Sequence, residues 1–322
     1  MNRREFLGAA VAAPFVARAG LADGVGIRAR AVALVTADAE RRVVVVDLAS
    51  GRVLKHITVG AGPRSIEVVA DGRMAVVGHF NDRLISIIDL RTLQLVGEIG
   101  DIGEPRYTAA HRDGRHAHVT DSARGELVTL DLQSRRIVAR VDIGAFARHV
   151  TIDPSGRRVL AALGSRAPKI AIVDVDNPLR PRLVRLLHAV DAAHDVAATP
   201  NGRLAWISSG ATRRVAIHDL ATTRLLTTVD AGHWPQHIAH LGGLTYVTSG
   251  DDGTLAVFET ATGRRVRSHT VPEGSYNVVA ATGHVATPSL DQGTLTILPP
   301  GGRRARVVPV AKHAHDACIS IR

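Results

Sequence analysis

The chain is poor in cysteine and in aromatic residues. Its 322 residues include one cysteine, Cys318, so no disulfide can form within it. Aromatic residues make up 3% of the sequence, too few for the stacking surfaces that proteins use to bind single-stranded nucleic acid. The formal net charge is +10, but the basic residues are scattered among turns and form no dense patch. A nucleic-acid partner is therefore not expected.

Short catalytic fingerprints are also missing. The sequence contains no GxSxG, HExxH or CxxC motif, no phosphate-binding loop and no dinucleotide-binding glycine pattern. No motif of the sequence therefore points to one of these catalytic or nucleotide-binding sites. What the chain does have is an abundance of Val, Ile, Leu, Thr and Gly, a composition that favours strands and tight turns.

The N-terminus reads as an export signal. NRREFLG at residues 2–8 precedes an apolar run that is too short, and too interrupted by Pro14 and Arg18, to span a bilayer. The pair Arg3-Arg4, followed by Glu5 and two apolar residues, resembles a twin-arginine signal. The resemblance implies that residues 1–22 are a signal peptide, cleaved after Ala19 or Ala22. We expect a periplasmic or secreted protein without a membrane anchor.

One unit then recurs along the whole mature chain. The apolar segment VVVVDL ending at Leu48 returns six times, at steps of 40 to 45 residues, as ISIIDL, LVTLDL, IAIVDV, VAIHDL, LAVFET and LTILPP. Each unit contains four short apolar segments separated by turn sequences such as Asp-Gly, Ser-Gly and Asn-Gly. Four strands per unit, joined by such turns, are typical of a propeller blade.

The sequence therefore predicts an all-β fold, a seven-bladed β-propeller of four-stranded blades over residues 30–322. The first unit begins at AVALVTAD and lacks its leading strand, whereas the last ends with one strand too many, ACISIR. We expect that C-terminal strand to pair into the N-terminal blade. Such pairing closes the ring and leaves no open sheet edge.

These repeats resemble the YVTN-type β-propeller family over about residues 30 to 322. The best copy is Tyr246-Val247-Thr248-Ser249 with the segment GDDGTLAVFETATGRRV; Gly60-Ala61-Gly62-Pro63 and Pro200-Asn201-Gly202 match other parts of the repeat. The resemblance implies the fold. It does not select a function, because similar propellers serve as haem domains of nitrite reductases, lactonases, streptogramin lyases and binding scaffolds.

The two faces of the predicted ring differ. We call the loop before each innermost strand the mouth loop, since it should border the central channel. Aligned by repeat, the mouth loops carry Arg64-Ser65, Arg106-Tyr107, Arg148-His149, His194-Asp195, Gln236-His237, Tyr276-Asn277 and His315-Asp316. The opposite face carries short turns explained by turn geometry alone. Histidines mapping there or to strands, such as His111, His116 and His118, are expected to have surface or packing roles.

The mouth loops supply the candidate site. Imidazoles are common metal ligands and general bases, so the candidate metal ligands are His149, His194, His237 and His315. Guanidinium groups suit carboxylates and phosphates, and the candidate ligand-binding residues are Arg64, Arg106, Tyr107, Arg148, Trp234, Tyr276, Asp195 and Asp316. Because His194 and His315 fall in blades almost opposite each other, one ion could reach both only in a narrow channel or with a third ligand.

Three functions compete at this stage. The leading hypothesis is an exported, monomeric binding protein that holds a small anionic ligand, a divalent metal ion or a haem-type cofactor at the channel mouth. The second is an enzyme, a haem-type oxidoreductase, lyase or lactonase, that uses a mouth histidine. The third is a protein-interaction scaffold. Because neutral imidazole is the ligating form, metal binding is expected to weaken below a pH of about 6.5.

Overall fold

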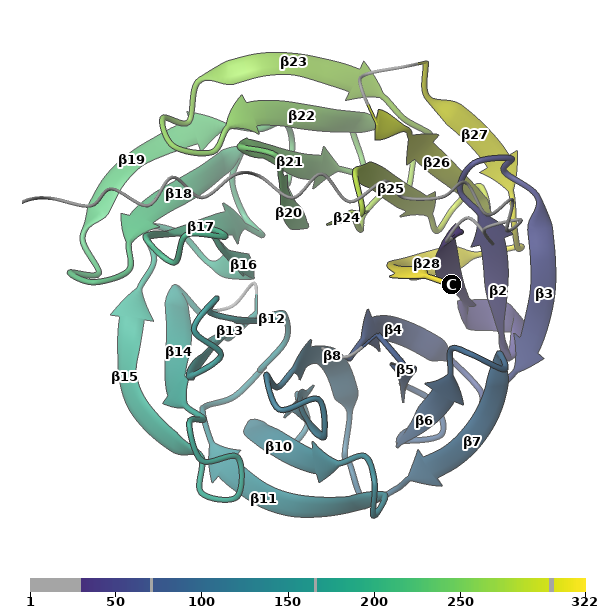
Figure 1. The fold of residues 1–322 in the computed structure, drawn as a ribbon. Coiled ribbons are helices and arrows are strands. Elements are labelled where there is room, and N and C mark those ends of the chain that lie inside the picture. The colour runs from purple at the N-terminus through teal and green to yellow at the C-terminus, as the bar shows by residue number, and fades with distance from the viewer. Residues whose placement is uncertain (1–29, 70–71, 165–166, 301–303) are drawn as a thin grey trace, which may run out of the picture.

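Seven antiparallel four-stranded sheets stand around a central channel (Figure 1). The computed structural model describes residues 30–69, 72–164, 167–300 and 304–322, so the predicted signal peptide, residues 1–22, lies outside the described residues. The predicted fold class, an all-β seven-bladed propeller, is confirmed. Helical structure is minimal; the helix bounded within the described residues is a single 3-10 turn, η1 (Asp38–Glu40). No helix in this part of the chain is long and apolar enough to cross a membrane.

Blade 1 is closed by strands from both ends of the chain. Its sheet order is β28-β1-β2-β3, and the strands are β28 (Ala314–Ile321), β1 (Ala31–Ala37), β2 (Arg42–Asp47) and β3 (Val53–Thr58). The innermost strand β28 pairs antiparallel with β1, with Leu34 opposite Cys318. The expected ring closure by the C-terminal strand is thus confirmed.

The other six blades are each formed from one continuous segment. In chain order from the channel outward, their strands are β4 (Pro63–Val68), β5 (Met74–His79), β6 (Leu84–Asp89) and β7 (Gln94–Ile99) in blade 2; β8 (Pro105–Ala110), β9 (His116–Asp121), β10 (Glu126–Asp131) and β11 (Arg136–Asp142) in blade 3; β12 (Val150–Ile152), β13 (Arg158–Ala162), β14 (Lys169–Asp174) and β15 (Arg182–His188) in blade 4; β16 (Ala193–Ala198), β17 (Leu204–Ser209), β18 (Arg214–Asp219) and β19 (Leu225–Asp230) in blade 5; β20 (Ile238–Leu241), β21 (Leu244–Ser249), β22 (Thr254–Glu259) and β23 (Arg265–Thr270) in blade 6; and β24 (Val279–Ala281), β25 (His284–Ser289), β26 (Thr294–Leu298) and β27 (Arg306–Pro309) in blade 7.

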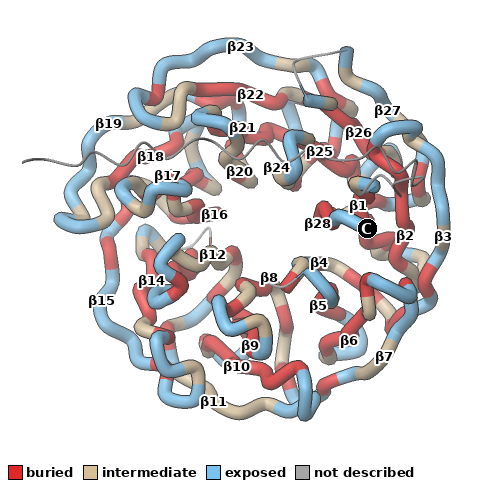
Figure 2. Tube along the Cα trace, viewed as in Figure 1, coloured by how far each residue is buried: buried red, intermediate tan, exposed pale blue. Residues whose placement is uncertain are grey.

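The two middle strands of each blade are buried on both faces, which explains their continuous apolar runs. In β2 all four valines are buried, whereas β3 is largely exposed and the other outermost strands are exposed or half-buried (Figure 2). The hydrophobic cores lie between neighbouring blades. Cys318 of β28, for example, packs with Val45 and Val77 in the core shared by blades 1 and 2. Each blade is therefore stabilised by its neighbours, and the ring as a whole buries what a lone blade would expose.

The turns on the opposite face adopt the geometry that their sequences predict. Gly72 and Gly114 have φ angles of 71° and 66°, in the left-handed region that glycine enters without steric cost. These two turns join the first and second strands of blades 2 and 3. Of these two turns, only that of blade 3 is flanked by histidines, His111 and His116.

Candidate metal centre at the channel mouth

Hydroxyl groups of the neighbouring blade fix the mouth loops in place. Thr36 Oγ1 donates a hydrogen bond to the carbonyl oxygen of Arg64 at 3.3 Å, and Thr120 Oγ1 donates to that of Arg148 at 2.5 Å. The same contact recurs in two further blades, from Ser208 to Gln236 and from Thr248 to Tyr276. A Ser or Thr near the end of the second strand thus holds the next blade's mouth loop, and with it the side chains that border the channel.

The aspartate of each Ala-His-Asp triplet joins two blades. Asp195 accepts hydrogen bonds from the backbone N–H of Val196 at 2.7 Å and of Ile238, in the next blade, at 2.9 Å. Asp316 accepts one from the N–H of Ile66, also in the next blade, at 3.0 Å. Burial raises the pKa of both carboxyl groups to about 7, although the backbone N–H groups oppose the shift. Asp195 and Asp316, which were both candidates for ligand binding, therefore already accept backbone hydrogen bonds. These bonds position the neighbouring His194 and His315.

Three of the four predicted metal ligands lie together. His149 and His237 stand immediately before β12 and β20, and His194 lies in β16. Ligand nitrogens of the three side chains are all within 4.8 Å of one another. The Nε2 atoms of His149 and His237 are 2.7 Å apart, and the ring centres of His149 and His194 are 4.7 Å apart. We call His149, His194 and His237 the histidine triad.

The hydrogen bonds around the triad favour bare Nε2 nitrogens. His149 Nδ1 lies 2.5 Å from the carbonyl oxygen of His194, so this nitrogen carries the proton and donates it. The Asp195 carboxylate, 4.0 Å from His237 Nδ1, favours a proton on that nitrogen as well. Without an ion, the Tyr107 hydroxyl, 3.2 Å from His237 Nε2, is placed to donate to that nitrogen, and a bound ion would take the place of this hydrogen. Two lone pairs consequently converge, an arrangement that a cation stabilises. A metal-bound histidine typically donates its other N–H in this way.

Electrostatics keep the triad neutral. Burial, together with the neighbouring histidines and Arg148, holds the pKa values of His149 and His237 well below their usual range. Burial, followed by Arg148 and Arg106, lowers the pKa of His194 to about 3. All three imidazoles are therefore unprotonated at neutral pH, the state needed to bind a metal ion. The sequence-based expectation that metal binding weakens below about pH 6.5 assumed the pKa of a free imidazole. With these lowered pKa values, binding should weaken only at a lower pH.

Three arginines form a cationic rim beside the triad. The guanidinium groups of Arg64 and Arg106 lie over the Phe80 ring, at 5.2 and 5.6 Å from its centre. Burial and the charge of Arg148 lower the pKa of Arg106, whose Nε lies 2.9 Å from Glu104 Oε1. The buried Nε of Arg148 makes no hydrogen bond within the described part of the chain. This crowding of like charges favours an anionic ligand.

The fourth predicted metal ligand, His315, lies outside the triad group. Arg64 Nε donates to His315 Nε2 at 3.4 Å, and His315 Nδ1 lies 3.4 Å from Asp38 Oδ2. Both ring nitrogens thus have neighbours in blades 1 and 2. The structure separates the two Ala-His-Asp triplets, as their nearly opposite blades suggested.

The two remaining candidates, Trp234 and Tyr276, lie on the rim of blades 6 and 7. Trp234 is 46% exposed and stacks on His233, with ring centres 4.7 Å apart. The hydroxyl of Tyr276 donates to Asp251 Oδ1 at 3.1 Å. Neither side chain has a contact with the triad among the interactions of the described residues, so their role in ligand binding stays a prediction.

A small polar cavity of about 150 Å³ lies in the channel next to the triad. Its walls include Tyr107, His149, His237, Asp195, Asp316 and Glu67. Glu67 is exposed to the channel. The protein atoms around its carboxyl group, together with Asp316, nevertheless raise its pKa to about 8. The cavity has room for a few water molecules or a small ligand. It is too small to enclose a tetrapyrrole.

Sequence reasoning overlooked a second group of possible ligands on the opposite face. His111, Asp113 and His116 also place ligand atoms within 4.8 Å of one another. A signal was available: two histidines that directly flank a four-residue turn are cross-strand partners, and such side chains lie on the same side of a sheet. The Asp-Gly within the turn explains the segment by turn geometry alone, and this hides the pairing of the two histidines.

Fold and site together define a seven-bladed β-propeller with a histidine-lined channel mouth. The YNCE-like beta-propeller family matches residues 22–158 of the chain. No curated protein matches the sequence.

Several solved structures share the fold. A functionally unknown protein from Desulfotomaculum acetoxidans DSM 771 is 15% identical, with a TM-score of 0.77 over 90% of this chain and 98% of that one. The Kuenenia stuttgartiensis hydrazine synthase is 16% identical, with a TM-score of 0.68 over 86% of this chain and 91% of that one. The dihydro-heme d1 dehydrogenase NirN in complex with DHE is 17% identical, with a TM-score of 0.64 over 86% of this chain and 63% of that one. At these identities the likeness is one of fold.

Proposed function

We propose that the protein is an exported binding protein whose histidine triad holds a divalent transition-metal ion at the channel mouth. The observation that carries this proposal is the pair of Nε2 atoms of His149 and His237, which lie 2.7 Å apart while other groups favour the proton on the second nitrogen of each ring. Three neutral imidazoles with an open coordination position are the ligand set of catalytic zinc sites, and imidazole also suits copper and nickel.

The ligand proposed for this centre is a small anion bearing a carboxylate or phosphate group. Arg106 and Arg148 border the triad closely enough to lower the pKa of His194, and guanidinium forks bind such groups with two hydrogen bonds. In this arrangement the arginines orient the anion and Tyr107 donates its hydroxyl hydrogen. The bound metal would supply a positive charge that polarises the anion. Contact with these half-buried guanidinium groups should weaken as salt is raised, though less than contact with fully exposed ones.

The test is metal titration of protein stripped with a chelator. Wild type should bind Zn²⁺ or Co²⁺, and the variant with His149→Ala, His194→Ala and His237→Ala should lose that binding by at least about 100-fold, since loss of a mere supporting contact already costs 10- to 100-fold. A matched control is His56→Ala with His188→Ala, two exposed histidines on the outer strands β3 and β15. Equal binding by the triple variant and wild type, with the fold intact by circular dichroism, would refute the proposal.

A haem-type cofactor is the second candidate, and the fold shared with NirN in complex with DHE is what favours it. The cavity beside the triad, about 150 Å³, is too small for a macrocycle, so such a cofactor would have to lie outside this cavity. Haem titration separates the two candidates. A Soret band that shifts on binding and is lost in His194→Ala would favour the haem-type cofactor over the bare ion.

The export proposal has its own experiment. Replacing Arg3 and Arg4 with lysine should leave uncleaved protein in the cytoplasm, because the arginine pair is the feature on which the resemblance to a twin-arginine signal rests. Immunoblots of cell fractions measure the outcome. Normal export and cleavage of the double variant would rule out this route.

A further inference from the structure

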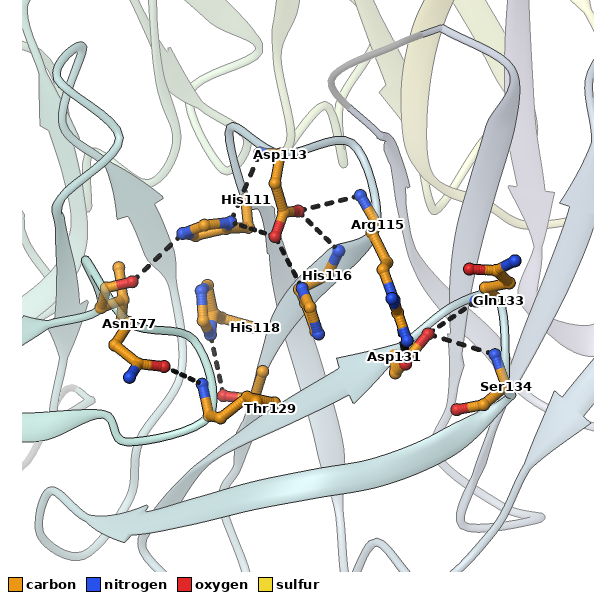
Figure 3. Close-up of polar contacts among 12 residues, drawn as sticks. His111, Asp113, Arg115, His116, His118, Thr129, Asp131, Gln133, Ser134 and Asn177 are labelled. Carbon is orange, nitrogen blue, oxygen red and sulfur yellow. Dashed lines mark hydrogen bonds and ion pairs between the residues drawn. The ribbon is translucent and has the colours of Figure 1, made fainter.

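The turn that joins β8 to β9 in blade 3 gathers His111, Asp113 and His116, which we call the turn cluster. It lies on the face opposite the mouth loops. The backbone N–H of His111 donates to the carbonyl oxygen of His116 at 3.0 Å, so the two histidines form the last cross-strand pair before the turn. Figure 3 shows their rings on either side of the Asp113 carboxylate. Both histidines are buried, whereas Asp113 is exposed.

The turn orients the carboxylate of Asp113. Its Oδ1 accepts hydrogen bonds from the backbone N–H of Arg115 and of His116, both at 2.9 Å (Figure 3). Its Oδ2 is thereby directed at the two rings, 3.1 Å from His111 Nδ1 and 2.7 Å from His116 Nδ1. One carboxylate oxygen and two imidazole nitrogens consequently point at one small volume.

The second nitrogen of His111 explains why this geometry favours a cation. His111 Nε2 lies 3.1 Å from the carbonyl oxygen of Val175 in blade 4, and only an N–H can bond to a carbonyl, so the neutral ring carries its proton there. Its Nδ1 lone pair then accepts a long hydrogen bond from the backbone N–H of Asp113, at 3.4 Å, and faces the Asp113 Oδ2. A positive charge near both would stabilise these two electron-rich atoms, which lie 3.1 Å apart. A carbonyl that holds the far N–H of a histidine is the usual support of a metal ligand.

No neighbouring arginine is placed to supply this positive charge to the turn cluster within the described residues. The two neighbouring arginines are already paired with other acids: Arg112 Nη2 lies 2.5 Å from Asp176 Oδ1, and Arg115 Nε lies 3.0 Å from Asp131 Oδ2. Below the turn cluster, His118 is fully buried and bonds Thr129 Oγ1 through Nδ1 at 3.1 Å.

His118 provides an independent sign that the region is polar but short of partners. Its Nε2 is buried and has no hydrogen-bond partner within the described residues, and its ring centre is 5.4 Å from that of His111 (Figure 3). A buried polar atom without a partner is costly. An ion or its bound water beside His111 would bring a partner close to that atom.

We propose that His111, Asp113 and His116 form a second divalent metal site, separate from the histidine triad, that ties blade 3 to blade 4. Two imidazole nitrogens and one carboxylate oxygen suit Zn²⁺ and its neighbours Co²⁺ and Ni²⁺. The link between blades runs through His111, whose ring bonds the ion on one side and the Val175 carbonyl on the other. The site is structural in kind, because it joins two segments and lies away from the channel.

The experiment counts metal ions per folded chain. Chelator-stripped full-length protein is titrated with Co²⁺, followed by the visible absorbance of the ion and by equilibrium dialysis, and the bound metal is quantified. Wild type should bind two equivalents. The variant His111→Ala with His116→Ala should bind one, with the spectrum of the histidine triad unchanged. Asp113→Asn, which keeps an oxygen for the two backbone N–H groups, should weaken the second equivalent by at least about 100-fold while preserving the turn.

The possible outcomes separate this site from the proposed function. If wild type binds a single equivalent that persists in His111→Ala with His116→Ala, the second site does not exist. Unchanged affinity in both Asp113→Asn and the double variant would overturn it equally. If the single equivalent instead disappears with these variants and is indifferent to His149→Ala, His194→Ala and His237→Ala, the turn cluster is the metal site and the proposal for the channel mouth fails. Circular dichroism and melting curves verify that each variant is folded.

Discussion

The histidine triad and the turn cluster reach similar ligand sets by opposite routes. The triad takes one histidine from each of three consecutive blades, at intervals of 45 and 43 residues, and its geometry depends on the hydroxyl and aspartate contacts that join blades. The turn cluster takes all its ligands from six consecutive residues of one hairpin. The geometry of the histidine triad therefore depends on the closure of the ring, whereas the turn cluster requires little more than a correctly formed turn.

Opening the ring should have the largest effect on this contrast. Deletion of residues 313–322 removes β28 and exposes the cores that blade 1 shares with blades 2 and 7. We expect the free energy of unfolding to fall by more than about 4 kcal/mol, with loss of metal at the channel mouth although no triad ligand is deleted. Denaturant melts and Co²⁺ titration measure both effects. A truncated protein with an unchanged melting temperature would show that the ring closes elsewhere.

Acid should distinguish the triad from an ordinary histidine site. The folded-state pKa values of its imidazoles lie below the value of about 6.5 in an unfolded chain. Protons therefore compete with the metal only at lower pH, and the mouth should retain Co²⁺ at a pH of about 5. In the metal-free protein, at a pH between the folded-state and the unfolded-state pKa values, the unfolded chain binds more protons than the folded chain. The contribution of the triad to stability is thus lost as the pH falls below about 6.5.

The carboxyl groups of Asp195 and Asp316 act with the opposite sign. Their folded-state pKa of about 7 exceeds the ordinary value of 3.8, so the stability they contribute is lost as the pH rises through about 7. Melting curves of metal-free wild type and of His194→Ala, recorded from pH 4 to 8, separate the two contributions. A stability difference between these two proteins that does not depend on pH would contradict the assignment of a depressed pKa to His194.

Replacing Asp195 or Asp316 by alanine offers a matched pair of intermediate size. Each change leaves backbone N–H groups of two blades without their acceptor, and each should reduce the free energy of unfolding by about 2 kcal/mol. Only Asp195→Ala should also weaken metal binding at the mouth, since Asp195 lies 4.0 Å from His237 Nδ1, whereas Asp316 is next to His315, outside the triad. Equal metal affinity in the two variants would mean that Asp195 does not position His237.

The smallest expected effect concerns the turns. Gly72→Ala and Gly114→Ala place a side chain at φ angles of 71° and 66°, and each should cost about 1 kcal/mol of stability. Because only the turn of blade 3 contains the turn cluster, Gly114→Ala should weaken its metal binding and Gly72→Ala should not. Thermal melts and Co²⁺ titration of the two variants provide the comparison, and identical metal binding by both would indicate that the turn tolerates distortion.

The fold could be predicted almost completely because a repeat reports it several times. The period, the Asp-Gly turns and the surplus strand ACISIR each pointed to the same closed ring. Aligning the repeats also placed His149, His194 and His237 in one column. The alignment could not show that these three meet while His315 pairs with Arg64 and Asp38, because distances across a channel depend on its radius and on side-chain rotamers.

Other properties of the site depend on burial, which the repeat does not encode. The pKa of a free imidazole gave the wrong range for His194, since the dry surroundings and Arg148 and Arg106 lower it to about 3. The inward turn of the Asp195 carboxylate toward the backbone of blade 6 could not be distinguished from a ligand-binding role. The turn cluster, in contrast, can be predicted from local spacing alone, because His111 and His116 directly flank a four-residue turn.

The pairing of the first and last strands of the propeller also has a consequence for the order of synthesis. Arg30 and Arg322 exchange backbone hydrogen bonds of 2.7 and 2.9 Å, and β1 finds its inner partner only in residues 314–321. Blades 2 to 7 can form one after another as they leave the ribosome, but blade 1 must wait until translation has reached β28. A nascent chain therefore carries an unpaired strand edge until residues 314–321 have been made.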